Sequence, residues 1–90
     1  MSPSARWRLE TTATFDREFR KLDRTIQKRV LACLLDIVQL PDPRLRGKGL
    51  TANRSGQWRY RVGDYRILTT IDEATLVVLA LTVAHRSDVY

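Results

Sequence analysis

The sequence contains one cysteine in 90 residues, so it can form neither an internal disulfide nor a metal site built from several thiolates. That cysteine, Cys33, lies in an apolar segment with helical spacing, and we expect a buried, inert thiol. Long hydrophobic runs are also lacking. The most apolar stretch, residues 76–83, is far too short to span a bilayer, and residues 1–8 lack the apolar centre of a signal peptide. Together these features predict a cytoplasmic protein.

Phosphate-binding and metal-binding motifs are missing as well. Gly47 and Gly49 are spaced as G-x-G, but they match neither a P-loop nor a dinucleotide fingerprint, which argues against nucleotide hydrolysis. The single histidine, His85, has no cysteine or paired carboxylates beside it, so no metal site is predicted. What remains is a composition of 43% hydrophobic and 29% charged residues, typical of one globular domain spanning residues 1–90.

The net charge of +6 is concentrated in one quarter of the chain. Residues 44–66 contain one acid, Asp64, whereas the remaining nine basic and nine acidic residues of the chain cancel. A localised positive field attracts polyanions such as nucleic acid, an acidic membrane surface or an acidic protein. The basic residues of this segment are Arg44, Arg46, Lys48, Arg54, Arg59, Arg61 and Arg66.

The first half of the chain predicts one strand and two helices. Residues 6–11 alternate modestly and indicate a strand. Thr12 or Thr14 can cap a first helix, and the apolar periodicity restarts after Asp23. Because Pro41 ends this second periodic segment, we expect a helical hairpin or one kinked helix.

The second half predicts a loop followed by three strands. Residues 41–55 show no periodicity and indicate a loop, whereas residues 56–62 alternate cleanly. A two-residue turn at 63–64 joins them to a returning strand at 65–71, and a third strand follows at 76–83. The order β-α-α-β-β-β predicts an α+β fold, with the helices packed on one side of a small, mainly antiparallel sheet.

The two-residue turn predicts which residues lie opposite each other in this hairpin. Arg61 should face Arg66, and Tyr60 should face Ile67, so the guanidiniums of Arg59, Arg61 and Arg66 share one face. Like charges directly opposite destabilise a sheet by up to roughly 1 kcal/mol per pair. An anion between them would explain the arrangement, because the planar fork of arginine binds phosphate oxygens in pairs. The alternative is that these long side chains spread apart into water.

A second cluster lies at the C-terminus, where residues 85–90 leave the last strand. We expect it to emerge at one end of the sheet, close to the strand that neighbours the hairpin. His85 can move protons near neutral pH, Arg86 can stabilise a developing pentavalent phosphate, and Tyr90 can stack on an exposed base. With the arginine face, these residues predict an RNA-cleaving site.

Two segments carry a resemblance to a known family. Residues 56–67, GQWRYRVGDYRI, and residues 83–90, VAHRSDVY, resemble the RelE toxins of the RelE/ParE superfamily, and the order of strands and helices agrees. The resemblance implies the toxin of a type II toxin–antitoxin system, an endoribonuclease that cuts mRNA in the ribosomal A site. In such toxins the 2′-hydroxyl of the RNA attacks the adjacent phosphate, without a metal or an organic cofactor.

The resemblance also implies roles for individual residues. Arg66 matches the arginine that binds the scissile phosphate, Arg86 the arginine that assists the leaving group, and Tyr90 the tyrosine that stacks on the message. Substrate-binding residues are expected in the loop of residues 41–55, namely Arg46, Lys48 and Arg54.

Arg59 and Arg61 depart from the family pattern, since related toxins carry lysines there, one of them the suggested general base. Arginine stays protonated in proteins and is a poor base. Our hypothesis is that His85 takes the acid–base role, with Lys48 as second choice. Purely electrostatic activation of the 2′-hydroxyl is a third alternative.

Two rival functions stay open. The ParE branch of the superfamily poisons DNA gyrase and cleaves no RNA, and a non-catalytic RNA or ribosome binder would use the arginines only to grip phosphate. The partners implied by the resemblance are mRNA, the ribosome and a RelB-like antitoxin, through which alone operator DNA would be contacted. A membrane partner is not expected, because no apolar stripe accompanies the basic residues.

Overall fold

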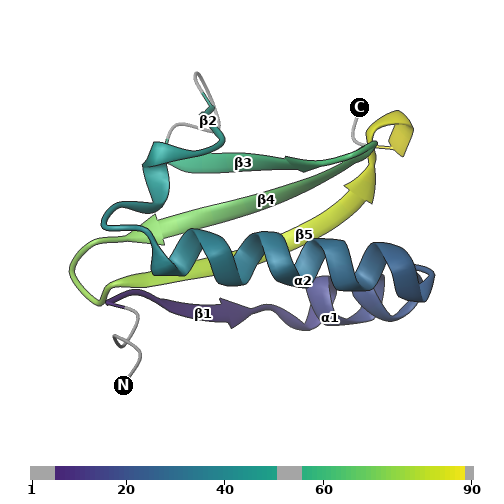
Figure 1. Ribbon diagram of the computed structural model, residues 1–90, viewed down its shortest axis with the longest axis horizontal. Coiled ribbons are helices and arrows are strands. Elements are labelled where there is room, and N and C mark those ends of the chain that lie inside the picture. Colours follow the sequence, from purple (N-terminus) through teal and green to yellow (C-terminus); the bar gives the residue numbers. More distant parts are fainter. Residues whose placement is uncertain (1–5, 51–55, 89–90) are drawn as a thin grey trace.

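Two helices cover one face of a five-stranded sheet in the computed structural model, which describes residues 6–50 and 56–88 (Figure 1). The strand order is β1-β5-β4-β3-β2, with β1 parallel to β5 and all other neighbours antiparallel. The predicted α+β class is therefore confirmed. Its elements are β1 (Arg8–Thr11), α1 (Ala13–Arg20), α2 (Arg24–Gln39), the 3₁₀ turn η1 (Pro43–Leu45), β2 (Lys48–Gly49), β3 (Gln57–Val62), β4 (Tyr65–Asp72), β5 (Val77–His85) and the 3₁₀ turn η3 (Arg86–Asp88).

Local capping explains where the helices begin. Of the two candidates for the first cap, Thr12 has this role, and its hydroxyl accepts a hydrogen bond from the main-chain N–H of Phe15 at 3.0 Å. Asp23 caps α2 in the same way through the N–H of Ile26. The chain thus forms a helical hairpin rather than one kinked helix, and α2 ends at Gln39, just before the first proline of the loop.

The loop predicted for residues 41–55 contains more structure than expected. It holds η1 and the two-residue strand β2, which extends the sheet beyond β3. The hairpin of β3 and β4 has the predicted register, with Arg61 opposite Arg66 and Tyr60 opposite Ile67. An irregularity lies elsewhere, between β4 and β5, where the pairing shifts after Leu68.

The main core lies between α2 and the sheet. Leu34 and Ile37 of α2 are almost completely buried against Tyr60 and Ile67 of the hairpin, and Cys33 is buried beside them as predicted. A smaller cluster of Trp7, Val38 and Val78 packs between the end of α2 and the start of β5. In the described part of the chain, no helix has the length and apolar character needed to cross a membrane.

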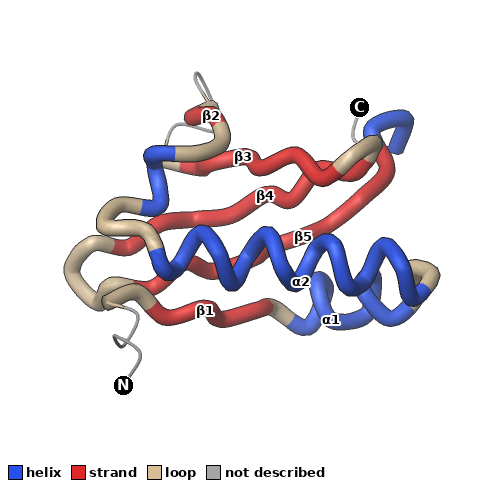
Figure 2. The backbone as a smooth tube through the Cα atoms, in the orientation of Figure 1, coloured by secondary structure: helices blue, strands red, loops and turns tan. Residues whose placement is uncertain are grey.

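Along its second half, the outer edge of β5 is covered by α1, whereas its first half pairs with β1. β1 ends at Thr11, and α1 follows along the second half of β5 (Figure 2). The Glu18 carboxylate accepts hydrogen bonds from the main-chain N–H of Val83, at 3.0 Å, and from the Thr82 hydroxyl. Thr12 donates from its hydroxyl to the carbonyl of Leu81 at 2.7 Å. An open edge would leave these groups free to pair with another chain.

We predict that Glu18→Ala lowers the free energy of unfolding by about 1–3 kcal/mol, because the substitution leaves the N–H of Val83 without its acceptor. Glu18→Gln is the matched control, since its amide oxygen can still accept, and it should lose less than half as much. Urea unfolding followed by circular dichroism measures both. Equal stability of the alanine variant and the wild type would contradict this account of the β5 edge.

Candidate functional site

Four basic side chains gather on the sheet face that the helices leave open. Because Tyr60 and Ile67 point into the core, alternation along the strands directs Arg59, Arg61 and Arg66 to the opposite face. Strand β2 adds Lys48, directly opposite Arg59. We call this set of Lys48, Arg59, Arg61 and Arg66 the basic face. It consists of two like-charged cross-strand pairs, Lys48–Arg59 and Arg61–Arg66.

Arg66 lies at the centre of the sheet, between Arg61 on β3 and Ala84 on β5. Its Nε and Nη1 atoms are buried, and neither has a hydrogen-bond partner among the described residues. A buried donor left without a partner costs about 1–3 kcal/mol, more for a charged group. A bound anion would offset the repulsion from Arg61, and it would satisfy both donors once the Arg66 side chain turned them toward the open face. Ala84 is not among the predicted site residues, yet its small side chain is the neighbour of Arg66 on β5.

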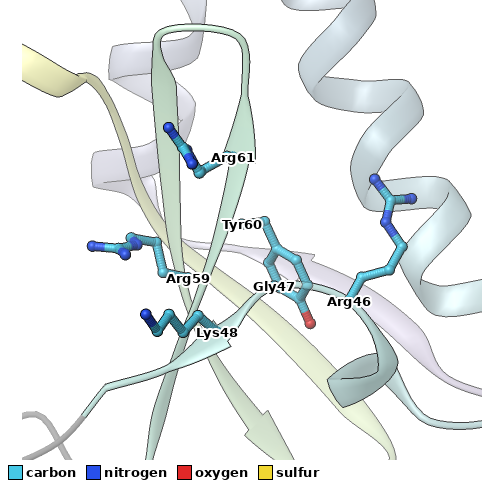
Figure 3. A pocket seen from close by; sticks show the side chains of 6 residues that line it. All are labelled: Arg46, Gly47, Lys48, Arg59, Tyr60 and Arg61. Carbon is cyan, nitrogen blue, oxygen red and sulfur yellow. The ribbon is translucent and has the colours of Figure 1, made fainter.

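A pocket of about 360 Å³ lies beside Arg61, at the edge of the sheet formed by β2 and β3. In Figure 3 the side chains of Lys48 and Arg59 project side by side, with Arg61 farther along the strand toward the turn. The side chain of Arg46 extends to the other side, toward α2. The pocket is lined by Arg46, Gly47, Lys48, Arg59, Tyr60 and Arg61.

Hydrogen bonds to strand β3 fix the loop that carries Lys48. The Tyr60 hydroxyl donates to the carbonyl oxygen of Pro43 at 2.7 Å, and burial raises the pKa of Tyr60 so that this donor keeps its proton. The Trp58 Nε1–H donates to the carbonyl oxygen of Arg46 at 2.6 Å. Between them Gly47 adopts φ +79°, a conformation that glycine accepts without strain. Lys48 is thus held at a defined position.

Two other basic residues of the loop, Arg44 and Arg46, contact neighbouring protein groups rather than joining the basic face. The sequence predicts that Arg46 binds substrate, but its guanidinium lies away from the basic face and donates from Nη2 to the Cys33 sulfur at 3.8 Å. Burial raises the pKa of Cys33, with the Arg46 charge opposing the shift. Arg44 forms ion pairs with Asp42 at 3.3 Å and Glu73 at 2.9 Å, which offset its charge. The predicted site residues Arg54 and Tyr90 lie outside the described residues.

The start of the C-terminal segment emerges at one end of the sheet, as the sequence predicts, and there it contacts the hairpin turn. The main-chain N–H of Arg86 donates to the carbonyl oxygen of Asp64 at 2.7 Å, and the Arg86 Nε lies 3.9 Å from the Asp64 carboxylate. Both side chains are more than 60% exposed, so the ion pair contributes little stability. Arg86 is therefore tethered by its backbone beside the turn, with its guanidinium accessible to a ligand.

His85 is not brought together with the arginines. It pairs with Tyr65, whose side chain packs against the core, and the two rings meet edge to face with centroids 5.3 Å apart. The Nδ1 atom accepts from the main-chain N–H of Ser87 at 3.2 Å. The ring therefore lies on the helix side of the sheet, with one nitrogen occupied. Within residues 6–50 and 56–88, no three histidine, cysteine, aspartate or glutamate side chains gather where they could hold a metal.

The architecture is similar to that of several toxin–antitoxin proteins. A chain of the RelBE2 toxin–antitoxin complex from Mycobacterium tuberculosis is 31% identical, with a TM-score of 0.81 over 89% of this chain and 98% of that one. Chains of the archaeal RelE–RelB complex from Pyrococcus horikoshii (20% identity, TM-score 0.73, covering 91% and 97%) and of the Escherichia coli RelBE complex (16%, 0.72, covering 88% and 95%) share the fold. Two helices packed on one face of a five-stranded mixed sheet are therefore a RelE-like toxin fold.

The family model for the ParE toxin of type II toxin–antitoxin systems matches residues 9–90. The chain therefore belongs to the RelE/ParE superfamily and is a type II toxin. No curated protein sequence matches it significantly.

We predict that Gly47→Ala destabilises the domain about 1–3 kcal/mol more than Gly56→Ala does. A Cβ at residue 47 would lie 2.5 Å from the carbonyl oxygen of Arg59 and 2.7 Å from the Tyr60 ring, whereas one at residue 56 meets nothing within 4 Å. Both glycines have positive φ, so the backbone strain is common to the two variants. Thermal unfolding measures the difference, and equal melting temperatures would show that the loop is not clamped on β3.

Proposed function

We propose that this toxin is a metal-independent endoribonuclease that cleaves mRNA in the ribosomal A site. The observation that carries the proposal is the Arg66 guanidinium, buried at two donor atoms that have no partner in the described residues and lying opposite Arg61. Such a pair binds a phosphodiester through charge and through the fork geometry of arginine. The site is positioned on strands of a packed sheet, which favours precise placement of the phosphate.

In the proposed reaction the 2′-oxygen of the RNA bonds to the adjacent phosphorus, and the bond from phosphorus to the 5′-oxygen breaks. The 2′-hydroxyl proton is released, and the departing 5′-oxygen gains a proton. The products are a 2′,3′-cyclic phosphate and a 5′-hydroxyl. Arg61 and Arg66 would neutralise the charge that develops on the non-bridging oxygens, and Arg86 would stabilise the leaving oxygen. Tyr90 would stack on a base of the message.

The geometry favours electrostatic activation of the 2′-hydroxyl over a histidine base. His85 lies on the helix side of the sheet, and its Nδ1 already accepts from Ser87. To take a proton from RNA on the basic face, the ring would have to leave Tyr65 and reach around the strand. Several fixed positive charges around the phosphate also favour the ionised 2′-oxygen, without any one group acting as base.

A RelB-like antitoxin is the proposed protein partner, because the similar solved structures include RelBE toxin–antitoxin complexes. The chain offers apolar surface for such a partner on α2, where Leu31 and Leu35 are 45% and 47% exposed. Neutralising the basic face would need acidic residues in the antitoxin.

Inhibition of DNA gyrase is the second candidate, because the matching family model is that of the ParE toxins. The two functions differ in what a purified toxin damages. A translation extract should show mRNA cut within codons if the first proposal holds, and gyrase-trapped DNA breaks should appear instead if the second does. A non-catalytic binder would do neither, and it would tolerate the charge-conserving Arg86→Lys without loss of ribosome affinity.

We predict that Arg66→Ala lowers the single-turnover rate of mRNA cleavage at least about 100-fold, as expected for the loss of a donor to a developing oxyanion. Arg66→Lys should recover only a small part, since lysine lacks the fork. Primer extension on an mRNA with and without ribosomes measures the rate and the positions of cleavage. Lys28→Ala, an exposed change on α2, is the charge-matched control and should cleave like wild type. An unchanged pattern in an Arg66→Ala, Arg86→Ala double variant would refute the site.

We predict that His85→Gln, which removes any possible base at this position, keeps the cleavage rate within about tenfold of wild type, because the histidine does not face the phosphate. A general base contributes typically about 10²–10⁴-fold, so the two roles are well separated. The same single-turnover measurement decides between them. A loss of 100-fold or more, with the pH-rate profile flattened near neutrality, would restore His85 as the base.

A further inference from the structure

The basic face contains two like-charged pairs, and the proposed reaction uses only one of them. In the proposed reaction Arg61 and Arg66 hold the scissile phosphate, whereas Lys48 and Arg59 lie opposite each other two residues farther from the hairpin turn along β3. We propose that Lys48 and Arg59 form a second phosphate site, which binds the linkage adjacent to the scissile one on the same RNA strand. This inference depends on the proposed ribonuclease function for the identity of the strand.

The spacing of the two pairs fits consecutive phosphates. Arg59 and Arg61 are two residues apart on β3, so their pairs lie about 6.7 Å apart along the strand direction. This distance is comparable to the repeat of an extended single strand, whose backbone would then run along β3.

The structure holds Lys48 at a defined position directly opposite a residue of like charge. Strand β2 has only two residues, and it brings a lysine directly opposite an arginine. The loop before it is fixed by the Trp58 and Tyr60 hydrogen bonds and by the close approach of Gly47 to β3. Lys48 has no ion pair within residues 6–50 and 56–88 and lines the pocket of Figure 3. A loop that served only to connect two elements would not need such placement.

A phosphate held by a specific pair differs measurably from a phosphate attracted by the whole charge of +6. A diffuse field responds to the total charge of the ligand, so removing any one linkage charge should have nearly the same effect. A pair responds to one linkage only. The proposal therefore predicts that each linkage of a short RNA depends on a different protein residue.

The test uses trinucleotides with two linkages and 2′-O-methyl riboses, which cannot be cleaved because the attacking hydroxyl is blocked. In two matched ligands one linkage or the other is a neutral methylphosphonate. Dissociation constants are measured by nuclear magnetic resonance titration at fixed, low salt. Each replacement should weaken wild-type binding about fivefold, in the range of an exposed charge contact.

We predict that Lys48→Gln reduces this sensitivity to less than about twofold at one linkage, and that Arg61→Gln does so at the other. Lys28→Gln on α2 removes the same charge elsewhere and should preserve both sensitivities. The proposal is overturned if Lys48→Gln weakens all three ligands equally, as a diffuse field would, or if it changes none of them.

The outcome is separable from the proposed function, because these ligands report binding without cleavage. If wild type cleaves ribosome-bound mRNA but Lys48→Gln shows no preference for a linkage, the second phosphate site is refuted and the nuclease proposal stands. If wild type cleaves no mRNA while the two linkages still depend on different residues, the nuclease proposal fails and the paired phosphate sites stand.

Discussion

The register of the β3–β4 hairpin is the constraint from which the rest of the molecule follows. Because side chains alternate between the two faces, a shift by one residue would expose Tyr60 and bury Arg61. The burial of Tyr60 and Ile67 in the core, together with the Tyr60 hydrogen bond to the loop, holds the register. The same register forces Arg61 against Arg66. The repulsion on one face is thus imposed by the packing on the other.

Local patterns predicted the β3–β4 hairpin and its register, because these depend on neighbours in sequence. They narrowed the first helix cap to Thr12 or Thr14 and the helices to a hairpin or one kinked helix, and the structure decided both. The sequence pattern did not predict on which face of the sheet His85 lies. Leu81 has no partner in the β4–β5 pairing, so the alternation that buries Val78 and Ala80 is shifted, and Val83 points inward in place of residue 82. Without this bulge, His85 would lie on the arginine face. Strand β2 was not predicted either, because a strand of two residues is too short to show an alternating pattern.

The basic face is costly, and other parts of the domain offset the cost. Like charges lie opposite each other twice, and two donor atoms of Arg66 are buried without partners in the described residues. Against this stand a core in which α2 contributes several nearly inaccessible side chains and an edge closed by Glu18. A site that is destabilising when empty gains stability when its anion binds. The unmet donors are thus an argument for a ligand rather than a defect of the fold.

The basic residues of the central segment that the structure describes do not act as one patch. Arg44 is paired with two acids, and Arg46 turns toward Cys33, so the described part of that segment directs only the four members of the basic face to the open side. The net charge can attract a polyanion from a distance, but this attraction falls off within a Debye length of about 10 Å at 0.1 M salt. Selection of phosphate must come from the cross-strand pairs at contact distance. Charge counting on the sequence detects the first effect, and only the register reveals the second.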